Sequence, residues 1–460
     1  MIKHILRTGL LWIGILSTTS AQIQFSLEEA IAYALENSST VKMQELEILD
    51  ADGQILEYKS TGIPTLDASV DYQYFLDIPT QILPDFISPA VYGVLFNENL
   101  LEQREISTNA TSPVRFGTDQ NVTANLTMNT MIFDYTWFKG LKAQQLYRDL
   151  VRKQLEQKEF DVRSNVTKAY LAILIAEKNY ELLEKNIDNL TDVRSETQAI
   201  FESGFAEQLD VDRLDFSLEN LKTERENVFR LIDISKNLLK FQMGFPIRDD
   251  ISLKDGFDNL VNLTITESLD LNEPVIYDNR PEYQAILMGL KLQDINQKVI
   301  KLGYLPRLDG FASYSRILQR NQLFNEEEAP WFPSTVVGIS MKVSIFDGLN
   351  KKARLARAKI DEEQTLVNKR EFERGMNLAV QNGRIQFINA RQTVLNRQKA
   401  LDLAQRIFDV AQIKYTEGVG SSLERTQAEA DLYTAQNNYI NALYDLIVAK
   451  TDLDIALGNL

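Results

Sequence analysis

The sequence contains no cysteine and a single histidine, His4. Most transition-metal sites, Ser-His-Asp triads and Cys-His dyads need one of these residue types, so their usual ligands and nucleophiles are missing. Acid–base chemistry by paired carboxylates remains formally open. With 65 Asp and Glu residues in the chain, however, such a pair is more often a solvated helix face. We predict that the protein is not an enzyme and that it holds no cofactor or metal.

Long hydrophobic runs are also missing, apart from one at the N-terminus. Residues 1–21 carry Lys3 and Arg7, then an apolar core, then the small residues Thr19-Ser20-Ala21. This is the pattern of a secretory signal peptide, and a retained membrane anchor is the alternative. No later segment has the ~20 consecutive apolar residues of a transmembrane helix. We therefore expect an exported protein.

Basic residues are outnumbered by acidic ones. The formal net charge is −16, and without the predicted signal it becomes −18, from 47 basic and 65 acidic residues. A nucleic-acid partner would favour a basic face. We expect no nucleic-acid partner.

What the chain does contain is one pattern that occurs twice. Phe201-Glu202-Ser203-Gly204 corresponds to Tyr415-Thr416-Glu417-Gly418, which lies 214 residues later. A repeat spread over most of a chain indicates a duplicated architecture. The predicted organisation is a signal peptide at 1–21, a first repeat at 22–244 with a strand pair at about 65–133, a linking segment at 245–279, and a second repeat at 280–460 with a strand pair at about 307–346.

Each repeat contains a very long helical stretch. Residues 137–203 and 347–417 lack proline and are rich in strong helix formers. Each stretch would span roughly 100 Å as a continuous helix, and helices of that length need coiled-coil-like packing. Turns at Gly204 and Gly418 then reverse the chain, and we predict return helices at about 208–242 and 422–457.

Alternation of apolar and polar residues predicts strands with one apolar and one polar face, near 66–74, 122–132, 308–316 and 337–346. Residues 78–119 are long for a loop. Such strands in an exported protein fit a transmembrane barrel, and a small soluble sheet that caps a coiled coil is the alternative. Four strands cannot close a barrel in lipid, so the membrane interpretation requires an oligomer. The sequence physics allows eight strands from two copies or twelve from three.

These elements together resemble the TolC-like outer-membrane efflux proteins. The resemblance covers essentially the whole mature sequence, and its ordered, duplicated motifs are SLEEAIAYALENS, PTLDASVDYQY, PRLDGFASYSR, FESGFAEQLDVDRL, NRPEYQA and YTEGVGSSLERTQAEADLYTAQNNY.

The resemblance implies a mainly α fold with a transmembrane β portion. Three protomers would each give four strands to a 12-stranded outer-membrane β-barrel, and their long helical hairpins would form a barrel in the periplasm. The implied partners are two further copies, outer-membrane lipid, a periplasmic adaptor (membrane fusion) protein, and an inner-membrane transporter of the RND, ABC or MFS type.

The resemblance also implies a periplasmic gate at the helical turns. By position Asp210, Tyr415 and Glu424 match gate residues, and Gly204 and Gly418 mark the tip turns. Two positions depart from the family pattern: Gly420 stands where some members carry an arginine, and Gln427 replaces an acid. The latch would then use other residues, either Arg213 or Arg425. The weaker gate candidates are these two arginines with Asp212, Gly420 and Gln427.

Charge gives an independent reason for a site at these turns. If threefold symmetry repeats the two turns, their acidic residues surround one aperture, and the negative charge there favours cations. The alternative is that helix ends simply collect polar residues, and Asp210 and Glu424 would then serve as helix caps or interact with the helix dipole. The acids are Glu202, Glu207, Asp210, Asp212, Glu417 and Glu424.

Aromatic residues near the strand ends could lie at the membrane interfaces, or they could simply pack between elements. They are Tyr72, Tyr74, Trp137, Phe311, Tyr314 and Trp331.

We predict a passive outer-membrane exit channel of a tripartite efflux pump. One alternative is the exit duct of a type I protein secretion system. A second, of a different class, is a soluble periplasmic coiled-coil structural protein.

Overall fold

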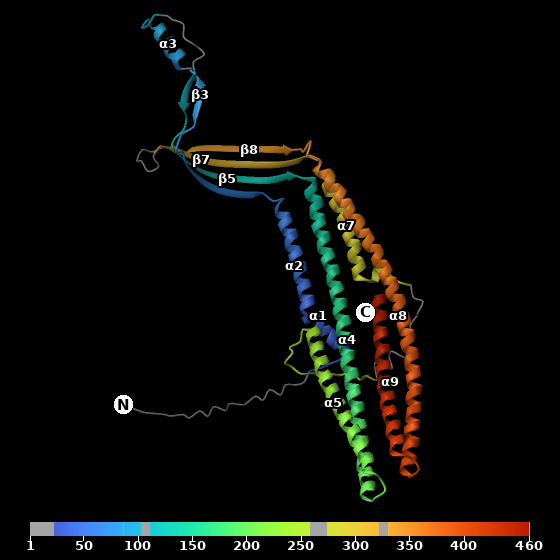
Figure 1. Cartoon of the computed structure of the whole chain (residues 1–460). Helices are drawn as coiled ribbons and strands as arrows, with labels where there is room; N and C mark the ends of the chain where they lie inside the picture. Colours follow the sequence, from blue (N-terminus) through green and yellow to red (C-terminus); the bar gives the residue numbers. More distant parts are fainter. Residues whose placement is uncertain (1–22, 86, 103–110, 258–273, 322–329, 460) are drawn as a thin grey trace, which may run out of the picture. The chain divides into compact units, whose positions relative to one another are not determined.

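The computed structural model describes residues 23–85, 87–102, 111–257, 274–321 and 330–459 (Figure 1). The predicted signal peptide lies outside these ranges. None of the helices in the described residues is long and apolar enough to cross a membrane. The chain divides into two compact units. Unit 1 comprises Met1–Ala51, Tyr147–Leu290 and Glu363–Leu460, and unit 2 comprises Asp52–Leu146 and Lys291–Glu362.

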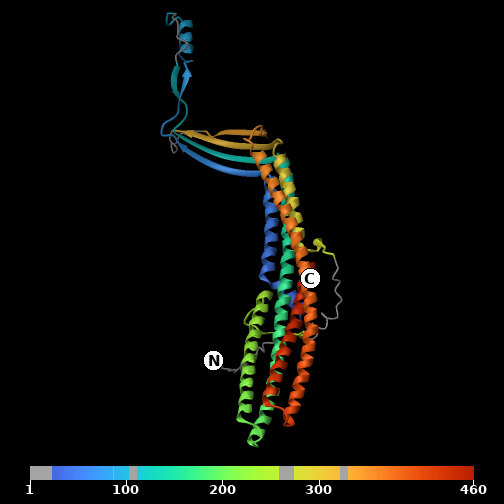
Figure 2. The ribbon, with the colours of Figure 1, turned by 45° about the vertical axis from the view of Figure 1, so that its right-hand side comes forward.

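Unit 2 contains a four-stranded antiparallel sheet in the order β2-β5-β7-β8. The strands form one layer in Figures 1 and 2. In the described chain, β2 and β8 each have a neighbouring strand on one side only. The sheet thus has two free edges. Its strands are β2 (Thr65–Tyr74), β5 (Gln120–Phe133), β7 (Arg307–Arg320) and β8 (Phe332–Lys342).

The strand register separates apolar from polar residues, as the alternation predicts. Leu66 lies beside Met128, which lies beside Ala312 and then Val337. The next row along the strands, on the opposite face, begins with Asp67 and Thr127. We call the side that carries Leu66, Met128, Ala312 and Val337 the apolar face of the sheet.

Two predictions about the strands were wrong in their limits. β8 begins at Phe332 and ends at Lys342, so it starts earlier and ends earlier than the predicted 337–346. β7 continues to Arg320, beyond the predicted end at 316. Proline is tolerated on an edge strand, which explains how β8 includes Pro333.

The segment 78–119 is more than the long loop that the sequence suggested. It contains a short antiparallel pair, β3 (Thr80–Pro84) and β4 (Thr111–Arg115), and the helix α3 (Ile87–Asn97). None of the α3 residues is buried.

The helices of unit 2 include the end of α2 (Ser39–Ser60) and the start of α4 (Tyr135–Glu202). The Trp137 indole N–H donates to the backbone oxygen of Tyr58 (3.3 Å) and to Thr61 Oγ1 (3.1 Å). These contacts agree with the packing alternative for Trp137.

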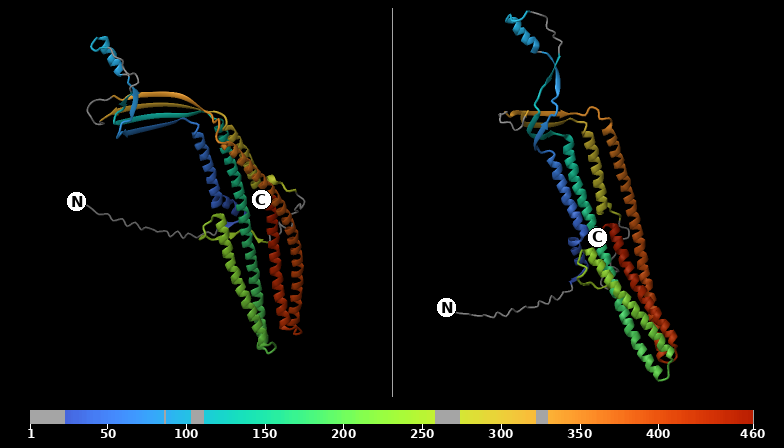
Figure 3. Two further views of the ribbon diagram at one scale, coloured as in Figure 1. Left: turned by 45° about the horizontal axis from the view of Figure 1, so that its top comes forward. Right: turned by 60° about the vertical axis from the view of Figure 1, so that its left-hand side comes forward.

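Unit 1 is built on two helical hairpins, which Figure 3 shows in green and in orange to red. The first consists of α4 and α5 (Gln208–Met243), and the second of α8 (Asn350–Thr416) and α9 (Ser422–Leu457). α4 and α8 have 68 and 67 residues, and α5 and α9 have 36 each, so the two copies agree closely in length. The predicted long helices and return helices are confirmed.

Glycines end the helices at matching places. Gly204 and Gly418 have φ of 78° and 75°, a left-handed conformation that costs a side-chain-bearing residue free energy. Gly244 and Gly458 take the same conformation after α5 and α9. Each pair keeps the offset of 214 residues, so the duplication holds through the complete hairpins.

The N-terminal part of unit 1 packs against the segment that links the repeats. β1 (Ile23–Phe25) pairs in parallel with β6 (Ile251–Leu253). Phe25, Tyr33 and Phe245 form an aromatic cluster with centroid distances of 5.6–5.8 Å. The remaining elements are α1 (Leu27–Asn37), the 3-10 helix η1 (Tyr277–Asn279) and α7 (Pro281–Leu302).

Candidate gate at the helical turns

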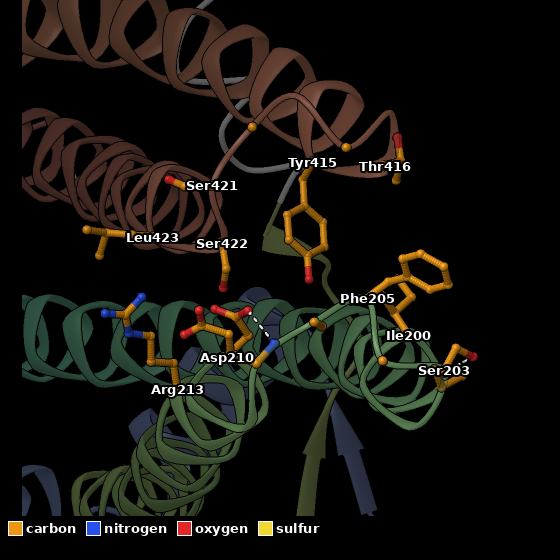
Figure 4. Close-up of a pocket in the computed structure, with 16 residues that line it drawn as sticks. Ile200, Ser203, Phe205, Asp210, Arg213, Tyr415, Thr416, Ser421, Ser422 and Leu423 are labelled. Atoms are coloured by element: carbon orange, nitrogen blue, oxygen red, sulfur yellow. Dashed lines mark hydrogen bonds between the residues drawn. The ribbon is translucent and has the colours of Figure 1, made fainter.

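The turn of the first hairpin and the turn of the second line one open cavity of about 1100 Å³ (Figure 4). Six of the gate candidates and tip-turn glycines named from the sequence lie around it, and so does Glu207 of the acidic residues at the turns. The structure thus brings together residues from two turns that are 214 positions apart in the sequence. The six are Gly204, Asp210, Arg213, Tyr415, Gly418 and Gly420.

Asp210 lies in the first turn of α5. Its carboxylate accepts a hydrogen bond from the backbone N–H of Glu207 at 3.2 Å, which is the dashed line in Figure 4. Glu207, and not Asp210, is the N-cap residue. A carboxylate in this position is stabilised by the helix dipole, so the helix-end interpretation accounts for Asp210 without any gate.

Glu424 occupies the matching position in α9 but does not line the cavity. Its backbone N–H donates to Ser421 Oγ at 3.1 Å, so Ser421 is the N-cap residue. The Glu424 carboxylate is exposed and forms an ion pair with Lys414 at 3.0 Å. Lys414 therefore offsets part of the negative charge that Glu424 brings to the turn.

Tyr415 lies in the last turn of α8 and is half-buried. Its hydroxyl points toward the turn of the first hairpin in Figure 4. The guanidinium carbon of Arg425 lies 5.7 Å from the ring centroid. A cation at this distance over an aromatic ring attracts it, so Arg425 helps to hold the ring in the cavity wall.

Arg425 is the weak latch candidate whose surroundings differ most from expectation. An arginine beside a turn is normally solvated, but Arg425 is 1% exposed. Its Nε donates to the Gln412 side chain of α8, and its terminal nitrogen Nη2 lies 3.7 Å from a carboxylate oxygen of Glu429. The side chain therefore fastens α8 to α9 inside the second hairpin.

Glu429 and Tyr433 complete this network, and the sequence analysis did not find them. Glu429 is 3% exposed and accepts a hydrogen bond from the Tyr433 hydroxyl at 2.8 Å. Burial raises the pKa of the Glu429 carboxyl, although Arg425 and Tyr433 act in the opposite direction. The sequence does contain a pattern that could have predicted the network. Arg425, Glu429 and Tyr433 are spaced by four residues, which places them on one face of a helix.

The network extends to the first hairpin. The Tyr433 oxygen lies 3.4 Å from the backbone oxygen of Asn186 in α4, and the Asn186 side chain donates to Gln436 at 3.1 Å. Lys168 and Asp452 form a further ion pair between α4 and α9 at 2.6 Å. We call Gln412, Tyr415, Arg425, Glu429 and Tyr433 the polar core of the second hairpin.

The first hairpin is built differently at the same place. Val211 stands where the second has Arg425, and it is 1% exposed. Near it Ile187, Leu190, Leu214 and Leu218 form an apolar cluster. The first hairpin thus has a buried valine where the second has a buried arginine. Its apolar cluster itself has apolar counterparts in the second hairpin, which are Leu401, Ala404, Ala428 and Leu432.

The first hairpin has a half-buried ion pair at the corresponding place. Asp215 stands where the second hairpin has Glu429. It accepts two hydrogen bonds from the Arg194 guanidinium of α4, at 2.9 and 3.1 Å. These bonds hold the pKa of Asp215 below its usual range.

The remaining candidates are placed as follows. Arg213 is half-buried in the cavity wall. Asp212 and Gln427 are exposed and bond to Gln208 and Asp431 within their own helices, at 2.8 and 3.0 Å.

Packing explains why position 420 is a glycine. A Cβ on residue 420 would lie 2.8 Å from the Cβ of Lys414, which is too close. A side chain at this position therefore requires a shift of the turn. In the described residues no group of acids or histidines is arranged to hold a metal ion.

Residues 277–459 match the sequence model of a family described as outer membrane efflux protein. The predicted likeness to the TolC-like outer-membrane efflux proteins is confirmed. The predicted fold class, mainly α with a β portion, and the predicted outer-membrane location are confirmed as well. The family is one of channel and transport proteins.

Two relatives from Pseudomonas putida are each 22% identical over 374 residues, which is 76% of this chain and 75% of theirs. They are the toluene efflux pump outer membrane protein TtgC and the antibiotic efflux pump outer membrane protein ArpC. Among solved structures, CusC has a TM-score of 0.71 at 14% identity and covers 95% of this chain and 93% of its own. The Campylobacter jejuni CmeC outer membrane channel has a TM-score of 0.70 at 16% identity and covers 94% and 85%. At these identities the structures show the shared fold.

Proposed function

We propose that three copies of this chain form the passive exit channel of a tripartite efflux pump, with its gate at the turns of the two helical hairpins. The observation that carries the gate is the single cavity to which both turns contribute. The channel itself has no source of energy. A periplasmic adaptor and an inner-membrane transporter would supply the substrate and the driving force.

The free edges of the sheet support the trimer. β2 and β8 leave unpaired backbone groups, and in lipid each such group costs several kcal/mol. Pairing β8 of one copy with β2 of the next removes both edges, and three copies then close a twelve-stranded sheet. Outer-membrane efflux proteins of pumps work with an adaptor and a transporter, and such channels are trimeric.

The unequal hairpins indicate which part of the gate moves. When the helices of the first hairpin separate, all the stabilisation that comes from burying its apolar cluster is lost. The second hairpin has the buried Arg425 where the first has Val211. The hydrogen bonds of its polar core can be exchanged for water when it opens, so opening costs less. We infer that the first hairpin is the fixed part of the gate and that the second is the moving part.

The names of the relatives, which describe efflux pumps for toluene and antibiotics, favour small molecules as substrates of this chain as well. Secretion of polypeptides would use the same channel. A soluble coiled coil is disfavoured by the apolar face of the sheet.

The channel is tested in planar bilayers with the chain extracted in detergent. We expect a mass of three chains and a low conductance that rises when the second hairpin is loosened by Arg425→Ala. A well-folded trimer that conducts in no state, including this variant, would count against the channel. Extraction in buffer without detergent would instead support the soluble alternative.

The role of Asp210 is tested by a matched pair of variants. Asp210 lines the cavity, whereas Asp212 lies two residues on, is exposed and does not line it. We expect Asp210→Asn to lower the preference for cations over anions and Asp212→Asn to leave it nearly unchanged. Equal effects would mean that the general charge of the turn, and not the cavity wall, sets selectivity.

A further inference from the structure

The apolar face of the sheet carries an arginine among otherwise uncharged neighbours. On the four described strands its charged positions are Arg316 and Arg320, whereas Asp67, Asp71 and Asp309 all lie on the opposite face. Arg320 is the last residue of β7, but Arg316 lies further in. An arginine among lipid-facing residues is costly unless its charge is matched.

Arg316 has no acidic partner in the part of the chain that the structure describes. Its Nε donates to the Tyr314 hydroxyl at 2.9 Å, which leaves the two terminal nitrogens of the guanidinium for another ligand. The contrast is Arg307 on the same strand, which bonds to Asp309 at 2.9 Å.

A shallow cavity of about 390 Å³ lies beside Arg316 on this face. Its lining includes Val70 and Leu126, which are apolar, and Tyr314, Arg316 and Trp331. Val70, Ala124 and Arg316 are neighbours across three strands. The cavity therefore combines an apolar floor with a cation and two aromatic rings.

The position of Arg316 along β7 gives its depth in the membrane. β7 starts at Arg307, a short turn after the end of α7 at Leu302, and the helical part lies in the periplasm. Nine residues of strand span ~30 Å, which a tilt of ~40° reduces to roughly the 25 Å height of the apolar band in such sheets. Arg316 then lies where the apolar band meets the outer headgroups. Tyr and Trp are enriched at that depth, which fits Tyr314 and Trp331.

We propose that Arg316, Tyr314 and Trp331 form a binding site for the phosphate group of an anionic lipid in the outer leaflet, with an acyl chain of that lipid along Val70 and Leu126. The site rests on the proposed membrane channel. The guanidinium can bind a phosphate through two parallel N–H···O bonds. The phosphate supplies the negative charge that the face lacks, and the apolar floor holds the lipid rather than a free anion.

The test is native mass spectrometry of the detergent-purified full chain, titrated with bisphosphorylated lipid A. We expect Arg316→Gln to weaken retention of this lipid about tenfold, the effect of losing a charge-assisted pair. Arg316→Lys should keep part of the binding, because it retains the charge without the fork geometry. Arg307→Gln is the control, since it removes an arginine from the same strand but leaves the apolar face unchanged.

Two comparisons decide what the site holds. Lipid A without phosphate groups should bind the wild type as weakly as the phosphorylated lipid binds the Arg316→Gln variant. Inorganic phosphate in millimolar excess should not displace the bound lipid. If phosphate displaces it, or if Arg316→Gln and Arg307→Gln have equal effects, the lipid site is wrong.

Failure of the channel gives a different result from failure of the site. A trimer that conducts but binds lipid A equally with and without Arg316 overturns the site alone. A chain that does not conduct overturns the channel, and the same titration on the detergent-solubilised chain still decides whether Arg316 binds lipid phosphate.

Discussion

At the scale of single residues, the most informative side chain is an arginine that is buried beside a turn. Arg425 occupies the position in the second hairpin that corresponds to the apolar Val211 in the first. The carboxylate of Glu429 is buried beside it. A buried ion pair is not in itself a source of stability, because removing two charges from water costs about as much as their attraction returns. What such a pair does impose is a penalty for losing one partner.

That penalty gives the first prediction. Arg425→Val leaves Glu429 buried without its cation and should lower the free energy of local opening of α9 by about 3 kcal/mol at neutral pH. The double variant Arg425→Val/Glu429→Leu should recover most of the loss, because it removes both charges and fills the interior with apolar side chains. Amide hydrogen exchange over the first turns of α9 measures both.

Glu424→Gln is the control for this experiment, because Glu424 is exposed and its loss should change the opening free energy by less than about 0.5 kcal/mol. If Arg425→Val is also neutral, the polar core does not hold the hairpin together.

The two equivalent acids should respond to pH in opposite directions. The folded-state pKa of Glu429 is raised by burial, so the stability that it contributes is present below the unfolded pKa of ~4.3 and is lost as pH rises through the folded value. The folded-state pKa of Asp215 is lowered by its hydrogen bonds to Arg194, so its contribution is present above ~3.9 and is lost as pH falls through the folded value.

Hydrogen exchange at the two turns over this pH range checks the prediction. From about pH 4 to pH 7, we expect the second hairpin to lose protection relative to the first. Glu429→Gln should abolish the change in protection of the second hairpin. Asp215→Asn should remove the loss of protection that the first hairpin shows at acid pH. A change of the same sign in both hairpins would mean that other groups dominate.

At the scale of elements, the turns depend on glycine for their backbone shape. Gly204 and Gly418 both have positive φ, with open space where a Cβ would lie. Alanine at either site should therefore cost about 1–2 kcal/mol through backbone conformation alone. The matched control is Gly53→Ala within α2, which also has open space but a helical backbone, and it should stabilise by about 0.5–1 kcal/mol.

Thermal unfolding of the purified variants gives the sign of each change. Opposite signs are expected for the turn glycines and for Gly53. A stabilising effect at residue 204 or 418 would contradict the conformational argument.

The regular elements were the part of the structure that the sequence predicts best. Proline-free stretches and the paired glycines give α4, α5, α8 and α9 within about two or three residues, because local propensity and packing agree there. The strand limits were less certain, since residues 332–336 combine proline with polar residues and read as a loop. β3, α3 and β4 were missed because short elements on a long connection carry little periodicity.

The polar core was missed for a different reason. Burial of Arg425 depends on how α8 and α9 pack, and a charged residue near a turn ordinarily predicts exposure. The repeat offset did contain a usable signal, since it aligns Arg425 with a valine at a position where the first hairpin is apolar. Reading the two copies against each other residue by residue would have placed Arg425 in the interior.

At the scale of the whole molecule, the prediction concerns the two faces of the sheet. Val336 and Val337 are adjacent in β8, are exposed in the single chain and lie on opposite faces. If the apolar face meets lipid, Val337→Lys places a charge in the bilayer at a cost of about 2–4 kcal/mol per copy near the midplane. Val336→Lys places the same charge on the polar face, where water is available.

Assembly should therefore fail for one variant and not for the other. We expect Val337→Lys to lower the yield of membrane-inserted trimer strongly, whereas Val336→Lys leaves it close to that of the wild type. The measurement is the amount of the heat-modifiable oligomer in the outer-membrane fraction. Because three copies carry the substitution, the cost applies three times in one assembly, so the two variants should differ clearly even if Val337 lies well away from the midplane. Equal yields would mean that lipid does not cover the apolar face, and the closed sheet would then need a different arrangement.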